Sequence, residues 1–146
     1  MWETIKTPAY VVDEKKLREN LECLHRVEEE TGCHILLAQK AFSMFRVYPL
    51  IGSYLSGTTA RLGYEEMKKE NHVFAPAYKT EDMKELVTIC DHIIFNSFAQ
   101  FEKHKEIISE YNNSQRENGN RVSIGMRVNP EFSTQEGHAI YDPCAP

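Results

Sequence analysis

The segment His34-Ile35-Leu36-Leu37-Ala38-Gln39-Lys40 decides the fold, because it joins an unbroken apolar run to a lysine at its end. A short apolar run of this kind predicts a buried β-strand, and a helix-like segment follows it. In proteins that alternate strands and helices, the carboxyl ends of the strands line the ligand crevice. Lys40 is therefore a candidate for a Schiff base or an anion contact, although position alone favours a lysine that caps a strand and faces water.

Further apolar runs predict more strands on both sides of this segment. Each run is short and is bounded by glycine, proline or polar residues, which is typical of strands. The expected strands cover residues 9–12, 34–39, 56–60, 72–76, 92–96 and 122–128.

Helical patterns lie between these runs. Asp13 is a good N-cap for a helix that Gly32 closes, and a short helix is expected over residues 61–70. Thr80 is expected to cap the next helix, and Ser97 opens an S-x-x-Q capping box for the one after it. The chain therefore alternates strands with helices along most of its length.

This alternation predicts the α/β class, with right-handed β-α units and a parallel sheet. Two arrangements fit the pattern: an open doubly wound sheet, or the N-terminal portion of a (β/α)8 barrel. A complete barrel needs about 250 residues, and the 146 residues here supply only part of one. The barrel interpretation therefore implies further chain or an obligate partner that covers the open strand edges.

Composition and charge exclude several classes of function. The chain has 41% hydrophobic and 27% charged residues and a net charge of -5, with the two signs interspersed. This distribution offers no basic stripe for nucleic acid and no polybasic segment for a membrane. No apolar signal core or spanning segment is visible, so a cytoplasmic protein is expected.

Neither the four cysteines nor the six histidines have a spacing that indicates a metal site. There is no C-x-x-C pair, so neither a disulfide framework nor a zinc site is expected. There is also no H-x-x-x-H or H-E-x-x-H pattern, so each histidine is interpreted as a strand-edge or surface residue. We therefore expect no metal.

Seven short blocks, in this order and spacing, resemble the carboxynorspermidine (carboxyspermidine) decarboxylase family. That family belongs to the alanine racemase-like, fold-type III enzymes, and the resemblance covers essentially the whole chain. The blocks are Thr7-Pro8-Ala9-Tyr10, Leu37-Ala38-Gln39-Lys40-Ala41-Phe42, Ser56-Gly57-Thr58-Thr59, Phe74-Ala75-Pro76-Ala77-Tyr78, Phe95-Asn96-Ser97-Phe98, Arg127-Val128-Asn129-Pro130 and Tyr141-Asp142-Pro143-Cys144.

The resemblance implies that residues 1–146 are the N-terminal part of a barrel that binds pyridoxal 5'-phosphate (PLP). It implies a C-terminal β domain that this chain lacks, and a homodimer whose interface shares the active site. The implied reaction is decarboxylation of a small carboxylated polyamine to norspermidine or spermidine. Lys40 matches the lysine that binds the cofactor as a Schiff base, and an apolar strand end would favour the neutral amine that attacks a carbonyl.

Arg127 matches an arginine of the family that approaches the cofactor, although a strand-end arginine paired with a carboxylate is an open alternative. Asn96 and Ser97 occupy the next crevice-facing turn, but a capping role explains Ser97 fully. His138 is not assigned a stacking role over the cofactor, because it lies in an irregular tail.

Two departures from the family pattern stand out. About six residues, under two turns of helix, are missing where Ala60 joins Arg61. The parts that would carry the phosphate loop and the acidic partner of the pyridine nitrogen lie beyond Pro146, so 146 residues alone are expected to have little activity. The alternatives are a related PLP decarboxylase or racemase with a diaminopimelate-like substrate, or a non-catalytic fragment.

Overall fold

The computed structural model describes residues 4–115, 119–132 and 134 of the chain. Within them, four strands form one sheet in which every neighbouring pair is parallel, and the order in the sheet is the order in the sequence. The strands are β1 (Gly57–Thr59), β2 (Glu70–Phe74), β3 (His92–Phe95) and β4 (Ser123–Met126).

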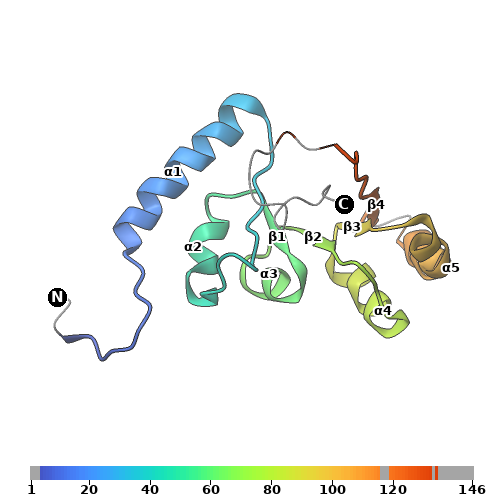
Figure 1. Cartoon of the computed structure of the whole chain (residues 1–146), viewed down its shortest axis with the longest axis horizontal. Helices are drawn as coiled ribbons and strands as arrows, with labels where there is room; N and C mark the ends of the chain where they lie inside the picture. The colour runs from blue at the N-terminus through green and yellow to red at the C-terminus, as the bar shows by residue number, and fades with distance from the viewer. Residues whose placement is uncertain (1–3, 116–118, 133, 135–146) are drawn as a thin grey trace.

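Helices precede, separate and flank these strands (Figure 1). Asp13 begins the first helix as predicted, since its carboxylate accepts a hydrogen bond of 3.2 Å from the backbone N–H of Lys16. Gly32 ends that helix with a φ of +69°, a left-handed conformation that glycine adopts without a steric cost. The helices are α1 (Glu14–Thr31), the 3-10 helix η2 (Phe45–Val47), α2 (Tyr48–Gly52), α3 (Ala60–Glu66), α4 (Thr80–Ile89) and α5 (Phe98–Ser114).

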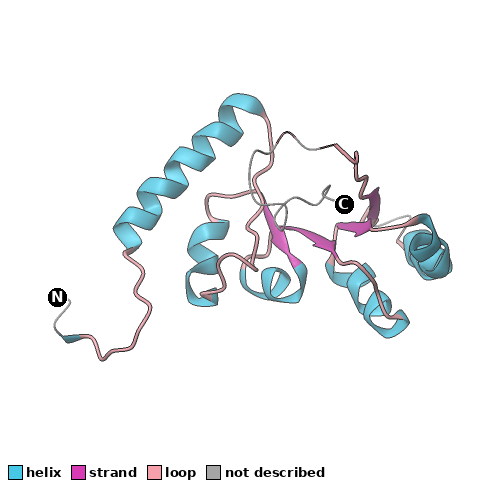
Figure 2. Ribbon diagram, in the orientation of Figure 1, coloured by secondary structure: helices cyan, strands magenta, loops and turns pink. Residues whose placement is uncertain are grey.

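The strand order distinguishes between the two predicted arrangements. A doubly wound sheet reverses its strand order at a switch point and carries helices on both faces, whereas barrel strands follow one another with the helices outside. Here the order runs from β1 to β4 without reversal, and α2 to α5 lie along one side of the sheet (Figure 2). The described residues therefore form a singly wound α/β segment of the kind found in barrels, and they do not close into a barrel.

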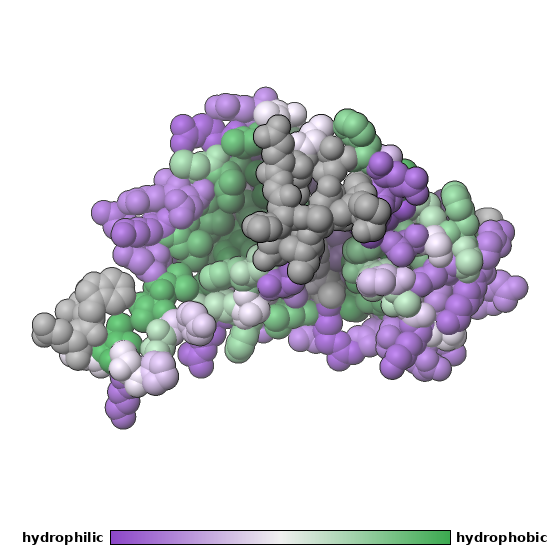
Figure 3. Space-filling model, viewed as in Figure 1, coloured by the Kyte–Doolittle hydropathy of each residue, from purple (hydrophilic) through white to green (hydrophobic). Residues whose placement is uncertain are grey.

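Two apolar clusters hold the helices in place. In the larger one, Ile93 and Phe95 of β3 are fully buried against Met83 of α4 and Ile108 of α5. His92 and Ile94 alternate with them and point to the opposite face of the sheet, where they are only partly buried. The second cluster joins α1 and α2 to the start of the sheet, and hydrophobic residues show between these two helices in Figure 3. Its buried members are Leu21, Tyr48, Ile51, Leu55 and Met67.

A buried carboxylate fastens α1 to the sheet. Glu28 is 8% exposed, and its Oε1 accepts hydrogen bonds from the backbone N–H groups of Ile35 (2.6 Å) and Ser56 (3.1 Å). Burial by itself raises the pKa of Glu28, but these hydrogen bonds and the nearby His25 outweigh it and lower that pKa. The charged form of Glu28 therefore stabilises the junction between α1 and the segment that leads into β1.

Several predicted boundaries are wrong. Residues 9–12 form no strand, and Tyr10 is 98% exposed. The expected strand over residues 34–39 is reduced to one parallel bridge between Leu36 and Gly57, because the three-residue β1 offers few backbone partners. The bridge nevertheless adds this segment to the sheet beside β1.

Other expected elements are present with shifted ends. The helix expected over residues 61–70 ends at Glu66, because Lys68 adopts a left-handed φ of +52° and reverses the chain before β2. The helix expected to follow Thr80 as its cap begins at Thr80 itself, with Lys79 as the cap residue. In the described part of the chain, no helix combines the length and hydropathy needed to cross a membrane.

Replacing Glu28 by glutamine is expected to lower the free energy of unfolding by about 1 to 2 kcal/mol at pH 7, because two backbone N–H groups then donate to a neutral acceptor. Since the pKa of Glu28 is lowered in the folded state, the charged form stabilises the fold above the unfolded pKa, and this contribution disappears as the pH falls through the folded pKa. The difference between Glu28→Gln and wild type should therefore shrink on acidification.

Urea unfolding of both proteins at pH 7 and at a series of acidic values measures this difference. Glu29→Gln is the matched control, since Glu29 is exposed on the same helix and its replacement should change stability by less than about 0.5 kcal/mol. Equal effects of the two substitutions at pH 7 would contradict the structural role of Glu28.

Candidate functional site

The carboxyl ends of the parallel strands meet at one edge of the sheet, which we call the carboxyl rim. It comprises Ala75, Asn96 and Arg127, which directly follow β2, β3 and β4, and the turn over residues 38–41. The turn lies at the same edge because Leu36 pairs in parallel with Gly57 of β1. In parallel α/β sheets this edge is where ligands bind.

Arg127 connects three adjacent strands at the carboxyl rim. Its backbone N–H donates to the carbonyl of Phe95 (2.8 Å), and its guanidinium donates to Asn96 Oδ1 at 3.4 Å. The guanidinium carbon lies 5.5 Å from the ring centroid of Phe74, within the range of a cation–π contact. Asn96 engages one of the five N–H groups of the guanidinium, so the exposed side chain of Arg127 has further donors for an anion.

Lys40 lies in a hydrogen-bonded turn, closed by the Ala41 N–H donating to the carbonyl of Ala38 (2.9 Å). The neighbouring Gln39 donates from Nε2 to the hydroxyl of the buried Thr58 at 3.3 Å, which attaches the turn to β1. Lys40 itself is exposed. Among the described residues, the apolar environment expected for its amine is therefore absent.

The other predicted rim residues separate into binding and capping roles. Ser97 caps α5 as expected, its hydroxyl accepting from the backbone N–H of Gln100 at 3.3 Å. The side chain of Gln100 donates to the carbonyl of Pro76 instead of completing the capping box. Asn96 is thus the member of this turn that reaches Arg127, and His138 lies outside the described residues.

Tyr78 fixes the spacing of β2 and β3 beneath the rim. Its hydroxyl accepts from the backbone N–H of Ala75 and donates to the carbonyl of Ile94, both at 2.9 Å. Burial raises the pKa of Tyr78 to about 12. The phenol therefore remains protonated at neutral pH and serves as a structural tie and not as a general base.

The opposite, amino ends of the strands carry a group of side chains that the sequence analysis did not bring together. We define the histidine cluster as His34, Glu70, His72 and His92. Glu70 Oε1 lies 2.9 Å from His72 Nε2 and 2.7 Å from His92 Nε2, and Glu70 Oε2 lies 2.8 Å from His34 Nδ1. One carboxylate therefore faces three imidazoles from three segments of the chain.

The cluster lowers the pKa of its carboxylate. Burial raises the pKa of Glu70, but hydrogen bonds with His34 and His72 and the charges of His72 and His92 outweigh it, and the net effect lowers that pKa. Glu70 is thus held as an anion among ring nitrogens.

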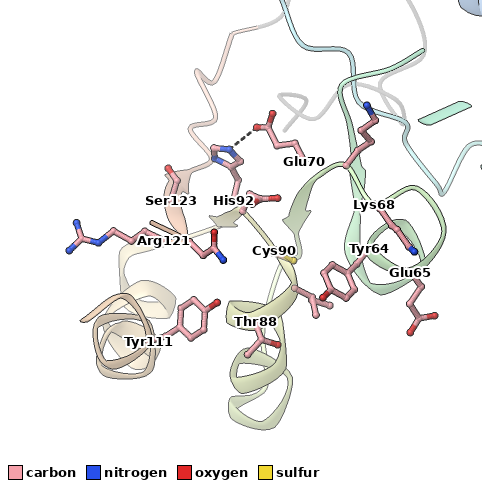
Figure 4. A pocket seen from close by; sticks show the side chains of 14 residues that line it. Tyr64, Glu65, Lys68, Glu70, Thr88, Cys90, His92, Tyr111, Arg121 and Ser123 are labelled. Carbon is pink, nitrogen blue, oxygen red and sulfur yellow. Dashed lines mark ion pairs between the residues drawn. The ribbon is translucent and has the colours of Figure 1, made fainter. Parts of the chain in front are cut away.

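An open cavity of about 1030 Å³ adjoins the cluster at the amino ends of the strands (Figure 4). Glu70 and His92 point toward one another at its edge, and Arg121, Tyr111 and Cys90 line it farther away. Cys90 is not a candidate nucleophile, because burial and the charges of Asp91 and Glu85 raise the pKa of its thiol to about 12.

A sequence signal for the cluster existed. Residues two apart on a strand share a face, so the pattern E-x-H at Glu70 and His72 places both side chains on one side of β2. His92 begins the next strand and pairs directly with His72. The patterns C-x-x-C, H-x-x-x-H and H-E-x-x-H are typical of metal ligands on loops and helices, so they do not cover ligands that come together across neighbouring strands.

Gly63 offers a test of the packing that supports the turn of Lys40. A Cβ at Gly63 would overlap with Thr58 Cγ2 and would lie 2.9 Å from Gln39 Nε2. Alanine in a helix gains about 1 kcal/mol over glycine, yet this overpacking costs about 1 to 3 kcal/mol. Gly63→Ala is therefore expected to lower the free energy of unfolding, measured by urea titration.

Glu65→Ala, an exposed substitution on the same helix, is the matched control and should change stability by less than about 0.5 kcal/mol. A Gly63→Ala protein more stable than wild type would show that α3 does not approach Thr58 and Gln39 so closely.

No protein-family model matches the chain, but individual proteins of known function do. The chain is 38% identical over 149 aligned positions to a carboxynorspermidine/carboxyspermidine decarboxylase of Campylobacter jejuni, covering 98% of this chain and 36% of that protein. It is 31% identical over 147 positions to a carboxyaminopropylagmatine decarboxylase of Synechocystis, with 97% and 35% covered.

A solved structure of the same kind of enzyme is also similar to this chain. The crystal structure of carboxynorspermidine decarboxylase from Campylobacter jejuni, complexed with norspermidine, matches with a TM-score of 0.71 and 31% identity. The match covers 88% of this chain and 43% of that one. The chain spans about a third of the length of the curated relatives it matches. Over nearly all of its residues, the chain resembles the N-terminal part of the carboxynorspermidine/carboxyspermidine decarboxylases.

Proposed function

We propose that this chain is the N-terminal part of a PLP-dependent enzyme that decarboxylates carboxynorspermidine or carboxyspermidine to norspermidine or spermidine. The observation that carries the proposal is the 38% identity across 98% of the chain to a decarboxylase of that name. The carboxyl rim supports it independently, since Lys40, Asn96 and Arg127 occupy the edge where such folds bind ligands.

The rim residues fit the chemistry of PLP. The cofactor carries an aldehyde and a phosphate, so it requires an accessible amine and fixed cationic donors. Lys40 is exposed in an ordered turn, and Arg127 is oriented by Asn96 and Phe74. Lys40 would hold the cofactor covalently, and Arg127 would bind one of its anionic oxygens.

When bound, PLP supplies an electron sink for the pair of electrons that remains as CO2 leaves. The chain's contribution is to position the scissile bond and to handle protons. Lys40 Nζ must be neutral to bind a carbonyl carbon. On release it would take up a proton from the incoming ammonium group of the substrate, and it can donate that proton to the carbon that lost the carboxylate. A guanidinium is a permanent cation in proteins, so Arg127 would act as an electrostatic anchor and not as an acid.

The assembly that completes the site belongs to the same proposal. We place the remaining cofactor contacts in a longer chain, with a C-terminal β domain and a homodimer that shares the active site. Within the described residues, β4 lies at the edge of the sheet with no strand beyond it, which supports further strands there, because natural proteins cover such edges. A cytoplasmic location fits an enzyme that acts on small polyamines.

A second candidate substrate has its own support. The relative from Synechocystis is named for carboxyaminopropylagmatine, and its 31% identity is close to the 32% of one of the carboxynorspermidine/carboxyspermidine decarboxylases. Both substrate types are carboxylated and cationic, so the described rim residues would treat them alike.

The test measures CO2 release by the full-length protein with PLP, using carboxynorspermidine, carboxyspermidine and carboxyaminopropylagmatine as substrates. Lys40→Arg keeps the positive charge but cannot form a Schiff base, so the rate should fall about a thousandfold or more. Arg127→Gln should weaken PLP binding about tenfold to a hundredfold, because it removes a charged hydrogen bond.

Lys79→Ala is the matched control, since Lys79 is an exposed lysine in the connection that follows β2 and should leave the rate unchanged. Undiminished CO2 release by Lys40→Arg would contradict the assigned role. Release from carboxyaminopropylagmatine alone would select the second substrate.

A further inference from the structure

The histidine cluster lies at the amino ends of the strands, away from the carboxyl rim that the proposed decarboxylation uses. Its members come from two neighbouring strands and from the segment that precedes the Leu36 bridge. A single histidine beside a carboxylate is explained by an ordinary structural hydrogen bond. Three imidazoles around one carboxylate indicate a shared role.

The sheet fixes the geometry of the three central residues. His72 and His92 are direct partners in the register of β2 and β3, and their rings stack with centroids 4.2 Å apart and an interplanar angle of 16°. Glu70 lies two residues before His72 and therefore on the same face of β2. Both Nε2 atoms lie within 2.9 Å of the same carboxylate oxygen, so the two ring nitrogens and this oxygen form one small group of possible ligand atoms.

We propose that Glu70, His72 and His92 bind a divalent transition-metal ion, with Zn²⁺ as the ion that this donor set fits best. Two imidazole nitrogens and one carboxylate oxygen are a recurrent protein ligand set for Zn²⁺. The three ligand atoms all lie within 4.8 Å of one another. Ligands of a tetrahedral Zn²⁺ site are about 3.3 Å apart, given bond lengths of about 2.0 to 2.1 Å.

Glu70 Oε1 lies 2.7 Å from His92 Nε2 and 2.9 Å from His72 Nε2. These two distances need to increase by only about half an ångström to admit the ion. The side chains of Glu70 and His92 can make this adjustment, because they are 27% and 36% exposed and line the open cavity. The cavity beside Glu70 and His92 gives access to a fourth ligand such as water (Figure 4).

His34 has a different part in this site. Its Nδ1 lies 2.8 Å from Glu70 Oε2, the carboxylate oxygen that does not face His72 and His92. A hydrogen bond there orients the carboxylate and keeps Oε1 directed at the ion, as outer-shell groups do in metal sites. The ion would link β2 to β3 at the end of the sheet opposite Lys40, so its role is independent of the decarboxylation.

The test titrates Zn²⁺ into tag-free, metal-stripped full-length protein by calorimetry. We expect binding of one equivalent, and His72→Gln and His92→Gln should each weaken it at least about tenfold, because even outer-shell changes have effects of that size. His25→Gln is the matched control, since His25 is a partly exposed histidine on α1 that faces Glu29. The Zn²⁺ affinity of this variant should equal that of the wild type.

A second measurement does not depend on variants. Co²⁺ in place of Zn²⁺ should give the intense visible absorption of a tetrahedral site, and Zn²⁺ should raise the midpoint of thermal unfolding until EDTA is added, because the ion binds only the folded state. The absence of saturable Zn²⁺ binding by the wild type would overturn the proposal and leave a purely hydrogen-bonded cluster. Binding of equal strength by His72→Gln, His92→Gln and His25→Gln would also overturn it, provided that circular dichroism shows all three to be folded.

Discussion

The parallel pairing of β2 with β3 is the constraint on which both candidate sites depend. It sets His72 opposite His92 and Phe74 opposite Ile94, so two chemically different groups form at opposite ends of the same two strands. At the carboxyl end, Arg127 rests over Phe74 and against Asn96. At the amino end, the carboxylate of Glu70 lies within 2.9 Å of a ring nitrogen of each of three histidines. Tyr78 stabilises this pairing with hydrogen bonds to both strands.

The sequence predicted the parts of the fold that depend on local chemistry. Asp13, Gly32 and Ser97 are where capping preferences place them, and the apolar strand β3 lies within one residue of its expected position. The sequence-based prediction was wrong where the pairing of strands in the folded protein determines the secondary structure. The apolar run at residues 34–39 has strong strand character, but it pairs with a three-residue β1 and makes a single bridge.

The candidate site shows the same division. Position in the alternating pattern was sufficient to place Lys40 and Arg127 at one edge of a parallel sheet, because strand polarity follows from connectivity. Position could not give the solvent exposure of Lys40, which depends on the tertiary contacts around its turn. The histidine cluster was missed because its members are up to 58 positions apart and meet only through strand register.

The role of Lys40 as the covalent anchor for PLP is the central claim, and one measurement tests it most directly. The purified full-length protein is incubated with PLP, reduced with borohydride, and analysed by intact mass and peptide mapping. The account predicts one reduced pyridoxyl group per chain, located on Lys40. An unmodified Lys40, or a pyridoxyl group on another lysine such as Lys79, would contradict it.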